Sequence, residues 1–262
     1  MSSHAVEVSP EAKAKNDAFL EDVKSGKINR RVKRHGKMAR VTHGTCAICC
    51  GLLAISGLFT FIPPLTAWAG QDVVFACRMA HRVFGTIFIA MPLISLFMYP
   101  KKALHIWKNL VHSWDSDDKK WMMLFMPYLF MAKWVHMPDQ SETKSGQRFA
   151  DGMIWILGLL MACSGVLLAL GTSLIDWGGL YRVWLFLHDL GFCGFAVFGM
   201  AHIFLGSGIF QPYRGMHRVM WGDGTISEPD VMYHWGHWGR EVFTTGEEVV
   251  NVGTGANEDA KA

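Results

Sequence analysis

The chain has 262 residues, of which 51% are hydrophobic and only 18% are charged, and its formal net charge is +3. Soluble domains carry charged residues at about a quarter of their positions, so this composition excludes an ordinary soluble protein with a large core. It predicts an integral membrane protein, in which lipid rather than water surrounds the apolar side chains.

The N-terminal part is polar and ends in the basic run KINRRVKRHGKMAR. No cleaved secretion signal is expected, because residues 1–40 contain no short apolar core. A basic run that adjoins an apolar segment is typical of the cytoplasmic side of a membrane. A nucleic-acid patch is the alternative, and we favour the membrane interpretation. We therefore predict a cytoplasmic basic arm at residues 1–37 and no nucleic-acid partner.

Four apolar segments are long enough to span a bilayer, at about residues 38–61, 76–99, 152–173 and 183–210. We predict that they form one domain, residues 38–210, followed by a cytoplasmic C-terminal tail at 211–262. Between spans two and three, the segment KKWMMLFMPYLFMAKWVH is too short and too interrupted by proline to span. We expect it to be a cytoplasmic interfacial helical segment. The predicted fold is all-α, a transmembrane four-helix bundle.

Basic residues predict the orientation of these spans. Residues 1–40 contain ten Lys and Arg, and residues 101–150 contain eight, whereas the two short loops on the other side contain almost none. Because basic loops stay in the cytoplasm, both termini and the middle loop are predicted to be cytoplasmic.

Four histidines lie within these spans at matched depths. His188 and His202 are 14 residues apart on span four, which places both on nearly one helix face, roughly 21 Å apart along the axis. His43 opens span one on the cytoplasmic side, and His81 opens span two on the outer side. The pairs that share a depth are therefore His43 with His202 and His81 with His188.

Each histidine pair can supply two axial ligands to one haem iron, since neutral imidazole is a strong iron ligand. Ionisable groups inside a membrane are costly and usually serve a site. Two b-type haems, one in each leaflet, are predicted. With both axial positions filled, each iron transfers electrons and catalyses no bond chemistry, so no catalytic residue is expected. Zinc is a weaker alternative, because the pairs are too far apart for one ion. A structural anchor whose histidines bind no haem is another.

Two further groups of residues fit the haem hypothesis. Glycines on the spans would let a flat macrocycle approach the backbone, or would serve close helix packing instead; they are Gly57, Gly85, Gly158, Gly165, Gly191 and Gly199. Basic side chains at span edges could pair with haem propionates or act as interfacial anchors; they are Lys37, Arg40, Arg78 and Arg82.

The six cysteines indicate neither disulfides nor covalently attached haem. All lie in or beside apolar segments, where cysteine usually acts as a small hydrophobic residue. The spacing Cys46-x-x-Cys49 lacks the following histidine of a c-type haem site.

Several motifs together resemble the cytochrome b (gamma) subunit of membrane-bound formate dehydrogenases, over roughly residues 38–242. They are THG at 42–44, MAH at 79–81, SGQR at 145–148, LH-x13-H at 187–202 and MYHWGHWGRE at 232–241. The resemblance implies a multi-pass protein of a bacterial inner membrane, within a complex that could form a higher oligomer. An iron–sulfur subunit and a molybdenum or tungsten catalytic subunit would be its partners.

The resemblance also implies an electron path from the outer iron–sulfur subunit to membrane quinone, menaquinone or ubiquinone, near the cytoplasmic side. His81 and His188 would hold the outer haem, and His43 and His202 the inner haem. The quinone pocket would lie by His202; its candidate residues are Gln147, Lys144 and Gly206, with Gly208 nearby. Lys144 departs from the family, which has an asparagine before this motif. The alternative is a cytochrome b subunit of a hydrogenase or of a thiosulfate/polysulfide-type reductase that oxidises quinol.

Overall fold

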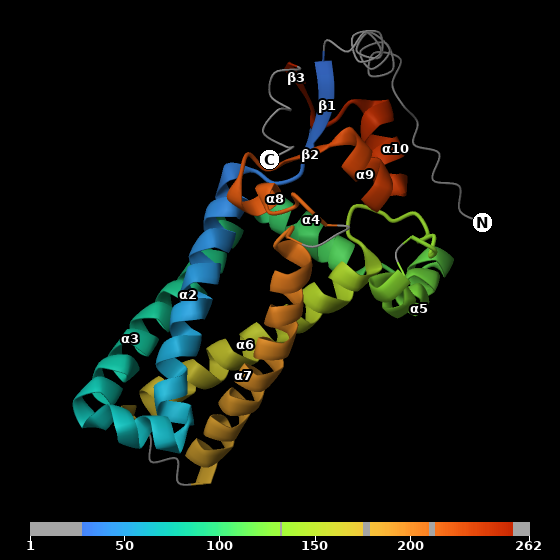
Figure 1. The fold of residues 1–262 in the computed structure, drawn as a ribbon. Helices are drawn as coiled ribbons and strands as arrows, with labels where there is room; N and C mark the ends of the chain where they lie inside the picture. The colour runs from blue at the N-terminus through green and yellow to red at the C-terminus, as the bar shows by residue number, and fades with distance from the viewer. Residues whose placement is uncertain (1–27, 132, 175–178, 210–212, 254–262) are drawn as a thin grey trace. The chain divides into compact units, whose positions relative to one another are not determined.

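The structure is a computed structural model that describes residues 28–131, 133–174, 179–209 and 213–253 (Figure 1). These residues form two compact units. The bundle unit comprises residues 38–107 and 150–204. The sheet unit comprises the described residues of 28–37, 108–149 and 205–253.

Four helices make up most of the bundle unit: α2 (Lys37–Phe61), α3 (Pro63–Met98), α6 (Ser145–Leu174) and α7 (Gly179–Gly206). Each is long and apolar enough to cross a membrane, which confirms the prediction of a multi-pass membrane protein. α3 begins earlier than the span expected from residue 76, because residues 63–75 are also helical, on both sides of a break at Gly70. The φ of Gly70 is 81°, a conformation that favours glycine.

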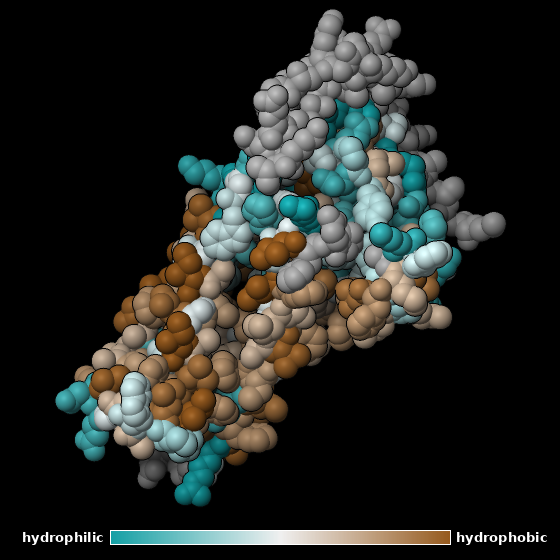
Figure 2. Space-filling model, viewed as in Figure 1, coloured by the Kyte–Doolittle hydropathy of each residue, from teal (hydrophilic) through white to brown (hydrophobic). Residues whose placement is uncertain are grey.

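The outer surface of the bundle unit is apolar. Ile48, Leu159 and Val197 expose 60%, 65% and 67% of their surface, and Figure 2 shows a largely brown, hydrophobic surface over these helices. In water such a surface would be unfavourable, whereas the hydrocarbon core of a bilayer covers it. The apolar residues of the spans therefore face outward to lipid as well as inward to neighbouring helices.

The segment between spans two and three forms α4 (Pro100–Val111) and α5 (Ser116–Met131). The helical character expected for this segment is present, and α5 continues through Pro127. Its location at a membrane interface stays a prediction.

A three-stranded antiparallel sheet is the feature that the all-α prediction missed. Its central strand is β1 (Ile28–Lys33), flanked by β2 (Thr225–Ser227) and β3 (Val249–Gly253). β1 alternates in burial, since Val32 is buried and Lys33 exposed. The strand lies within the predicted basic arm, and its partners lie within the predicted tail, so these two regions fold together. The many basic residues of β1 hide its alternating pattern.

The core of the sheet unit lies between this sheet and three short helices, α8 (Arg218–Trp221), α9 (Glu228–His234) and α10 (Gly236–Thr245). It consists of Val32, Ile226, Val231, Trp235, Val242 and Phe243. Arg30 is buried at its margin, where its Nε donates to Oε2 of Glu228 at 2.7 Å and its guanidinium lies 4.7 Å from the ring centroid of Phe243. A buried charge is tolerated there because it is paired.

Candidate functional site

The four predicted histidines form two ring pairs in the bundle unit. His43 on α2 faces His202 on α7, with ring centroids 6.1 Å apart and ring planes at 43°. His81 on α3 faces His188 on α7, with centroids 6.2 Å apart and planes at 70°. The pairing is the one expected from depth, and α7 contributes one ring to each pair.

The spacing within each pair fits one metal atom between two imidazoles. Metal–imidazole bonds are about 2 Å long, and a ring centroid lies roughly 1 Å behind its nitrogen, so two trans ligands place their centroids about 6 Å apart. Two rings joined by a direct hydrogen bond of about 2.9 Å would have closer centroids, at about 5 Å. The observed 6.1 and 6.2 Å agree with the first arrangement.

Serine hydroxyls hold both rings of the His81–His188 pair. Nδ1 of His81 lies 3.0 Å from Oγ of Ser56 on α2, and Nδ1 of His188 lies 2.9 Å from Oγ of Ser164 on α6. Both serines are buried. Because Nδ1 of each ring is occupied, Nε2 is the nitrogen left to bind a metal.

A glycine follows each of these serines and lies against the same ring. A Cβ at Gly165 would stand 3.3 Å from Cε1 of His188, and Gly57 has the same relation to His81. From the sequence alone, these glycines were expected to contact the macrocycle or to serve close helix packing. In the structure, they make room for the imidazole rings themselves.

The His43–His202 pair has a different environment. Oδ1 of Asp151 on α6 lies 3.8 Å from Nδ1 of His202, too far for a hydrogen bond but close enough for an electrostatic effect. A carboxylate near Nδ1 favours the proton on that nitrogen and leaves Nε2 for a metal. Asp151 is therefore an acidic neighbour of this pair, without the direct hydrogen bond that the serines make at the other pair.

Comparison with protein-family models matches the chain to the model described as prokaryotic cytochrome b561, over residues 34–221. The matched region includes all four paired histidines and well over half of the chain. The chain belongs to the prokaryotic cytochrome b561 family. A search of curated proteins finds no match.

Membership of the cytochrome b561 family means that the protein is a membrane electron-transfer cytochrome that binds b-type haem. Its donor set agrees, since paired neutral imidazoles are a usual haem ligand set. The number of haems, and the assignment of one haem to each pair, stay predictions.

The basic residues expected near haem propionates differ in exposure in this cytochrome. Arg78 and Arg82 flank His81 on α3 and are exposed, Lys37 is exposed, and Arg40 is half-buried.

Lys144, a candidate for the quinone pocket, is buried in the sheet unit of the cytochrome. Its Nζ lies 2.9 Å from Nδ1 of His234 and 4.3 Å and 4.8 Å from the ring centroids of Trp235 and Tyr213. Burial, with the nearby charge of Arg34, lowers the pKa of Lys144 well below its usual value. The side-chain nitrogen of Lys144 therefore has partners within the unit, and burial disfavours its charged form.

The SGQR motif, which contains another quinone candidate, anchors the start of α6. Oγ of Ser145 donates to Asp118 at 2.6 Å, and Arg148 forms an ion pair with the same carboxylate. Gln147 is half-buried in this turn and takes no part in those bonds, and Gly206 ends α7 with open space around its Cα. The assignment of Gln147 to a quinone pocket stays a prediction.

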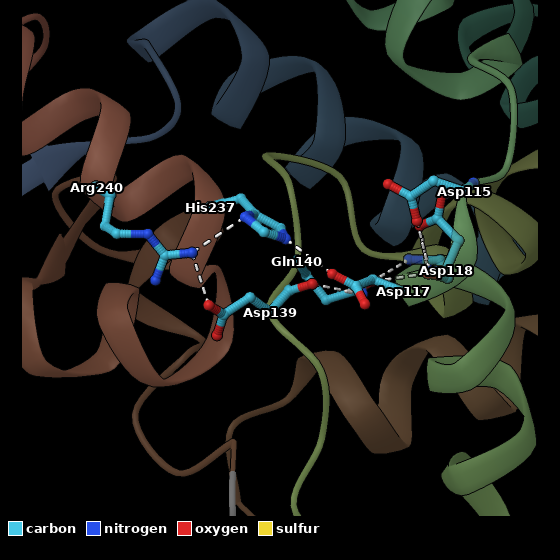
Figure 3. A network of polar contacts seen from close by, with 8 residues as sticks. Asp115, Asp117, Asp118, Asp139, Gln140, His237 and Arg240 are labelled. Atoms are coloured by element: carbon cyan, nitrogen blue, oxygen red, sulfur yellow. Dashed lines mark hydrogen bonds and ion pairs between the residues drawn. The ribbon is translucent and has the colours of Figure 1, made fainter. Parts of the chain in front are cut away.

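The MYHWGHWGRE motif also makes contacts within the sheet unit. His237 bridges two acidic regions, with Nε2 3.0 Å from Oδ2 of Asp117 and Nδ1 3.0 Å from Arg240, which in turn pairs with Asp139 at 2.6 Å (Figure 3). His234 contacts Lys144. These histidines of the tail thus stabilise the sheet unit.

Sequence reasoning missed three residues beside the histidine pairs: Ser56, Ser164 and Asp151. A signal was present in the sequence. A Ser-Gly dipeptide lies on the span before that of His81, and another lies on the span before that of His188. Buried hydroxyls in an apolar span need a partner, so the dipeptides pointed to interhelical contacts.

Proposed function

We propose that this cytochrome is the membrane anchor and electron-transfer subunit of a formate dehydrogenase-type complex. It would connect an iron–sulfur subunit on the outer side of a bacterial inner membrane to quinone near the cytoplasmic side. The observation that carries the proposal is the presence of two histidine pairs, each spaced for one metal atom, on three of the four helices that are long and apolar enough to span a membrane. The motif resemblance supports the choice of complex.

In this proposal, His81 and His188 hold an outer b-type haem and His43 and His202 hold an inner one. Bound haem supplies reversible one-electron transfer between the ferrous and ferric states. The chain would fix the ring orientations and surround the group with apolar helices, and two imidazoles per metal would leave no position for a substrate to bind. Its residues therefore favour electron transfer over bond chemistry.

The quinone pocket is assigned to Gln147, Lys144 and Gly206. Gly206 follows His202 by about one turn of α7. Lys144 can hold or release a proton because its pKa is lowered by burial, and its link to His234 gives that proton a second carrier. Quinone reduction at this side would take protons from the cytoplasm.

The test is isolation of the native complex in mild detergent under haem-replete growth. We expect about two b-type haems per chain, co-purifying iron–sulfur and molybdenum or tungsten subunits, and haem reduction by formate that quinone reverses. Co-purification of a nickel hydrogenase, or of a thiosulfate- or polysulfide-reducing molybdoenzyme, would assign the cytochrome to that complex instead. A single haem per chain would contradict the two-haem arrangement.

A further inference from the structure

The two serines beside the His81–His188 pair each have their only hydroxyl hydrogen engaged elsewhere. Oγ of Ser56 lies 2.7 Å from the carbonyl oxygen of Leu52, and Oγ of Ser164 lies 2.6 Å from that of Leu160. A carbonyl only accepts, so each hydroxyl donates to its own helix one turn back. The hydroxyl oxygen is then left as an acceptor.

The histidine must therefore be the donor in each serine–histidine bond. Nδ1 of His81 and Nδ1 of His188 carry hydrogen atoms directed at the serines, which leaves both Nε2 atoms with bare lone pairs. Ser164 has no exposed surface and Ser56 only 6%, so water does not compete for these bonds. A bare Nε2 is what an iron ligand requires.

The same Ser-Gly arrangement beside a histidine occurs twice, on separate helical hairpins. Ser56–Gly57 on α2 supports His81 on α3, and Ser164–Gly165 on α6 supports His188 on α7. In both cases the serine fixes the ring through a hydrogen bond, and the glycine lets the ring approach the neighbouring helix. The His43–His202 pair has a carboxylate 3.8 Å from His202 in place of a serine hydroxyl.

The geometry points to Ser56 and Ser164 as positioning residues of the His81–His188 haem site, whose hydroxyls hold both imidazoles as the Nδ1–H tautomer with Nε2 toward the iron. This inference rests on the proposed assignment of one haem to each pair. Accepting a hydrogen bond from Nδ1 also makes the imidazole a stronger donor to the metal, which stabilises the ferric state. The two pairs then differ in their surroundings, since neutral hydroxyls hydrogen-bond to both rings of one and a carboxylate lies 3.8 Å from one ring of the other.

The competing explanation is that the serines are present only because small residues pack well there. Substitution of each serine by threonine or by valine distinguishes this explanation from a role of the hydroxyl. The side chains of threonine and valine have nearly the same shape, but only threonine has a hydroxyl. The variants are S56T, S56V, S164T and S164V, with S56A and S164A for comparison. T86V is the matched control, because the hydroxyl of Thr86 donates to the carbonyl of Arg82 one turn back, as the serines do, and has no histidine contact described.

The measurements are haem content per chain and the midpoint potential of each haem component, by optical redox titration of the purified protein. The Val and Ala variants are expected to raise the potential of one component and to weaken its retention about tenfold. The Thr variants and T86V should keep both components at wild-type values. The haem of the His43–His202 pair is the internal reference for folding in every variant.

Equal behaviour of Thr and Val, or unchanged potentials in all variants with full haem content, would overturn the inference. Failure of the proposed haem assignment would be seen in other variants. H81A and H188A would then retain both haem components of the wild-type spectrum. The two failures are therefore distinguishable in one set of proteins.

Discussion

The backbone of Gly57 lies so close to His81 that a Cβ at this glycine would stand 3.3 Å from the ring carbon Cε1. Such a contact is tighter than ordinary van der Waals packing, and the ring would have to shift by a few tenths of an ångström. Gly165 and His188 have the same relation on the other hairpin. Small residues at these two positions thus set the positions of two proposed metal ligands.

Replacing either glycine by alanine is expected to disturb haem binding at the His81–His188 pair. We predict that G57A and G165A weaken retention of one haem component about tenfold, as for other changes beside metal ligands. G51A on the same helix is the control, because nothing lies within 4 Å of its added Cβ. Alanine there should stabilise α2 by up to about 1 kcal/mol. Equal haem loss in G51A and G57A would contradict the prediction.

Replacing either histidine of one pair should have the same effect on the visible haem spectrum. We predict that H43A and H202A remove the same b-type haem component, and that the H43A/H202A double variant loses no more than either single variant. The physical reason is that one iron needs both ligands of its pair. H105A on α4, an exposed histidine outside the pairs, is the control. Removal of different components by H43A and H202A would mean that the rings do not share a metal.

Asp118 is predicted to stabilise the sheet unit through Ser145 and Arg148. Both members of its ion pair with Arg148 are largely buried, so D118N should lower the free energy of unfolding of this unit by about 3 kcal/mol. D117N is the matched control, because the Asp117–His237 pair is about 40% exposed and such pairs contribute at most about 1 kcal/mol. Thermal unfolding followed by near-ultraviolet circular dichroism measures both. A similar loss in the two variants would show that burial of the pair is unimportant.

The contribution of Asp118 should also depend on pH. Burial alone would raise the pKa of its carboxyl group, but hydrogen bonds, chiefly from Ser145, and the charge of Arg148 outweigh burial and lower it. A lowered carboxyl pKa stabilises the fold above the unfolded value near 4, and this stability is lost as pH falls through the folded pKa. The wild-type protein should therefore lose more stability than D118N when the pH drops from about 5 to about 3.

Lys144 gives a pH dependence of the same sign, but at higher pH. Its pKa is lowered by burial and by the charge of Arg34, so between the folded pKa and about 10.5 the unfolded chain binds more protons than the folded one. The stability of the sheet unit should therefore rise with pH in that window. We expect this rise up to about pH 10, beyond which the tyrosines oppose it, since burial raises the pKa of Tyr213 to about 12.

Two substitutions of Lys144 test this account by thermal unfolding at several pH values. K144M should flatten the rise in stability and leave the unfolding free energy at pH 7 unchanged or higher, because a buried charge is replaced by a side chain of similar length. K144A should cost about 2–4 kcal/mol through the cavity it leaves. K119M, at an exposed lysine of α5, should change neither quantity. A steep pH dependence that persists in K144M would assign it to other groups.

The sequence by itself determined the four apolar helices and the pairing of the rings. These features follow from local patterns, since a helix in a bilayer forms its hydrogen bonds within itself and fixes depth by its rise per residue. His188 and His202 share a helix, so their separation could be calculated before any packing was known.

Only the tertiary structure decided which side chains support the histidines and how the polar ends fold. The contact of Ser56 with His81 depends on the rotation of two neighbouring helices about their axes, which the sequence spacing does not specify. The pairing of Val32 with Ile226 and Val249 joins strands far apart in the chain, and its register depends on long-range packing. The contact of Lys144 with His234 likewise forms only because the sheet unit brings the start of α6 to the end of α9.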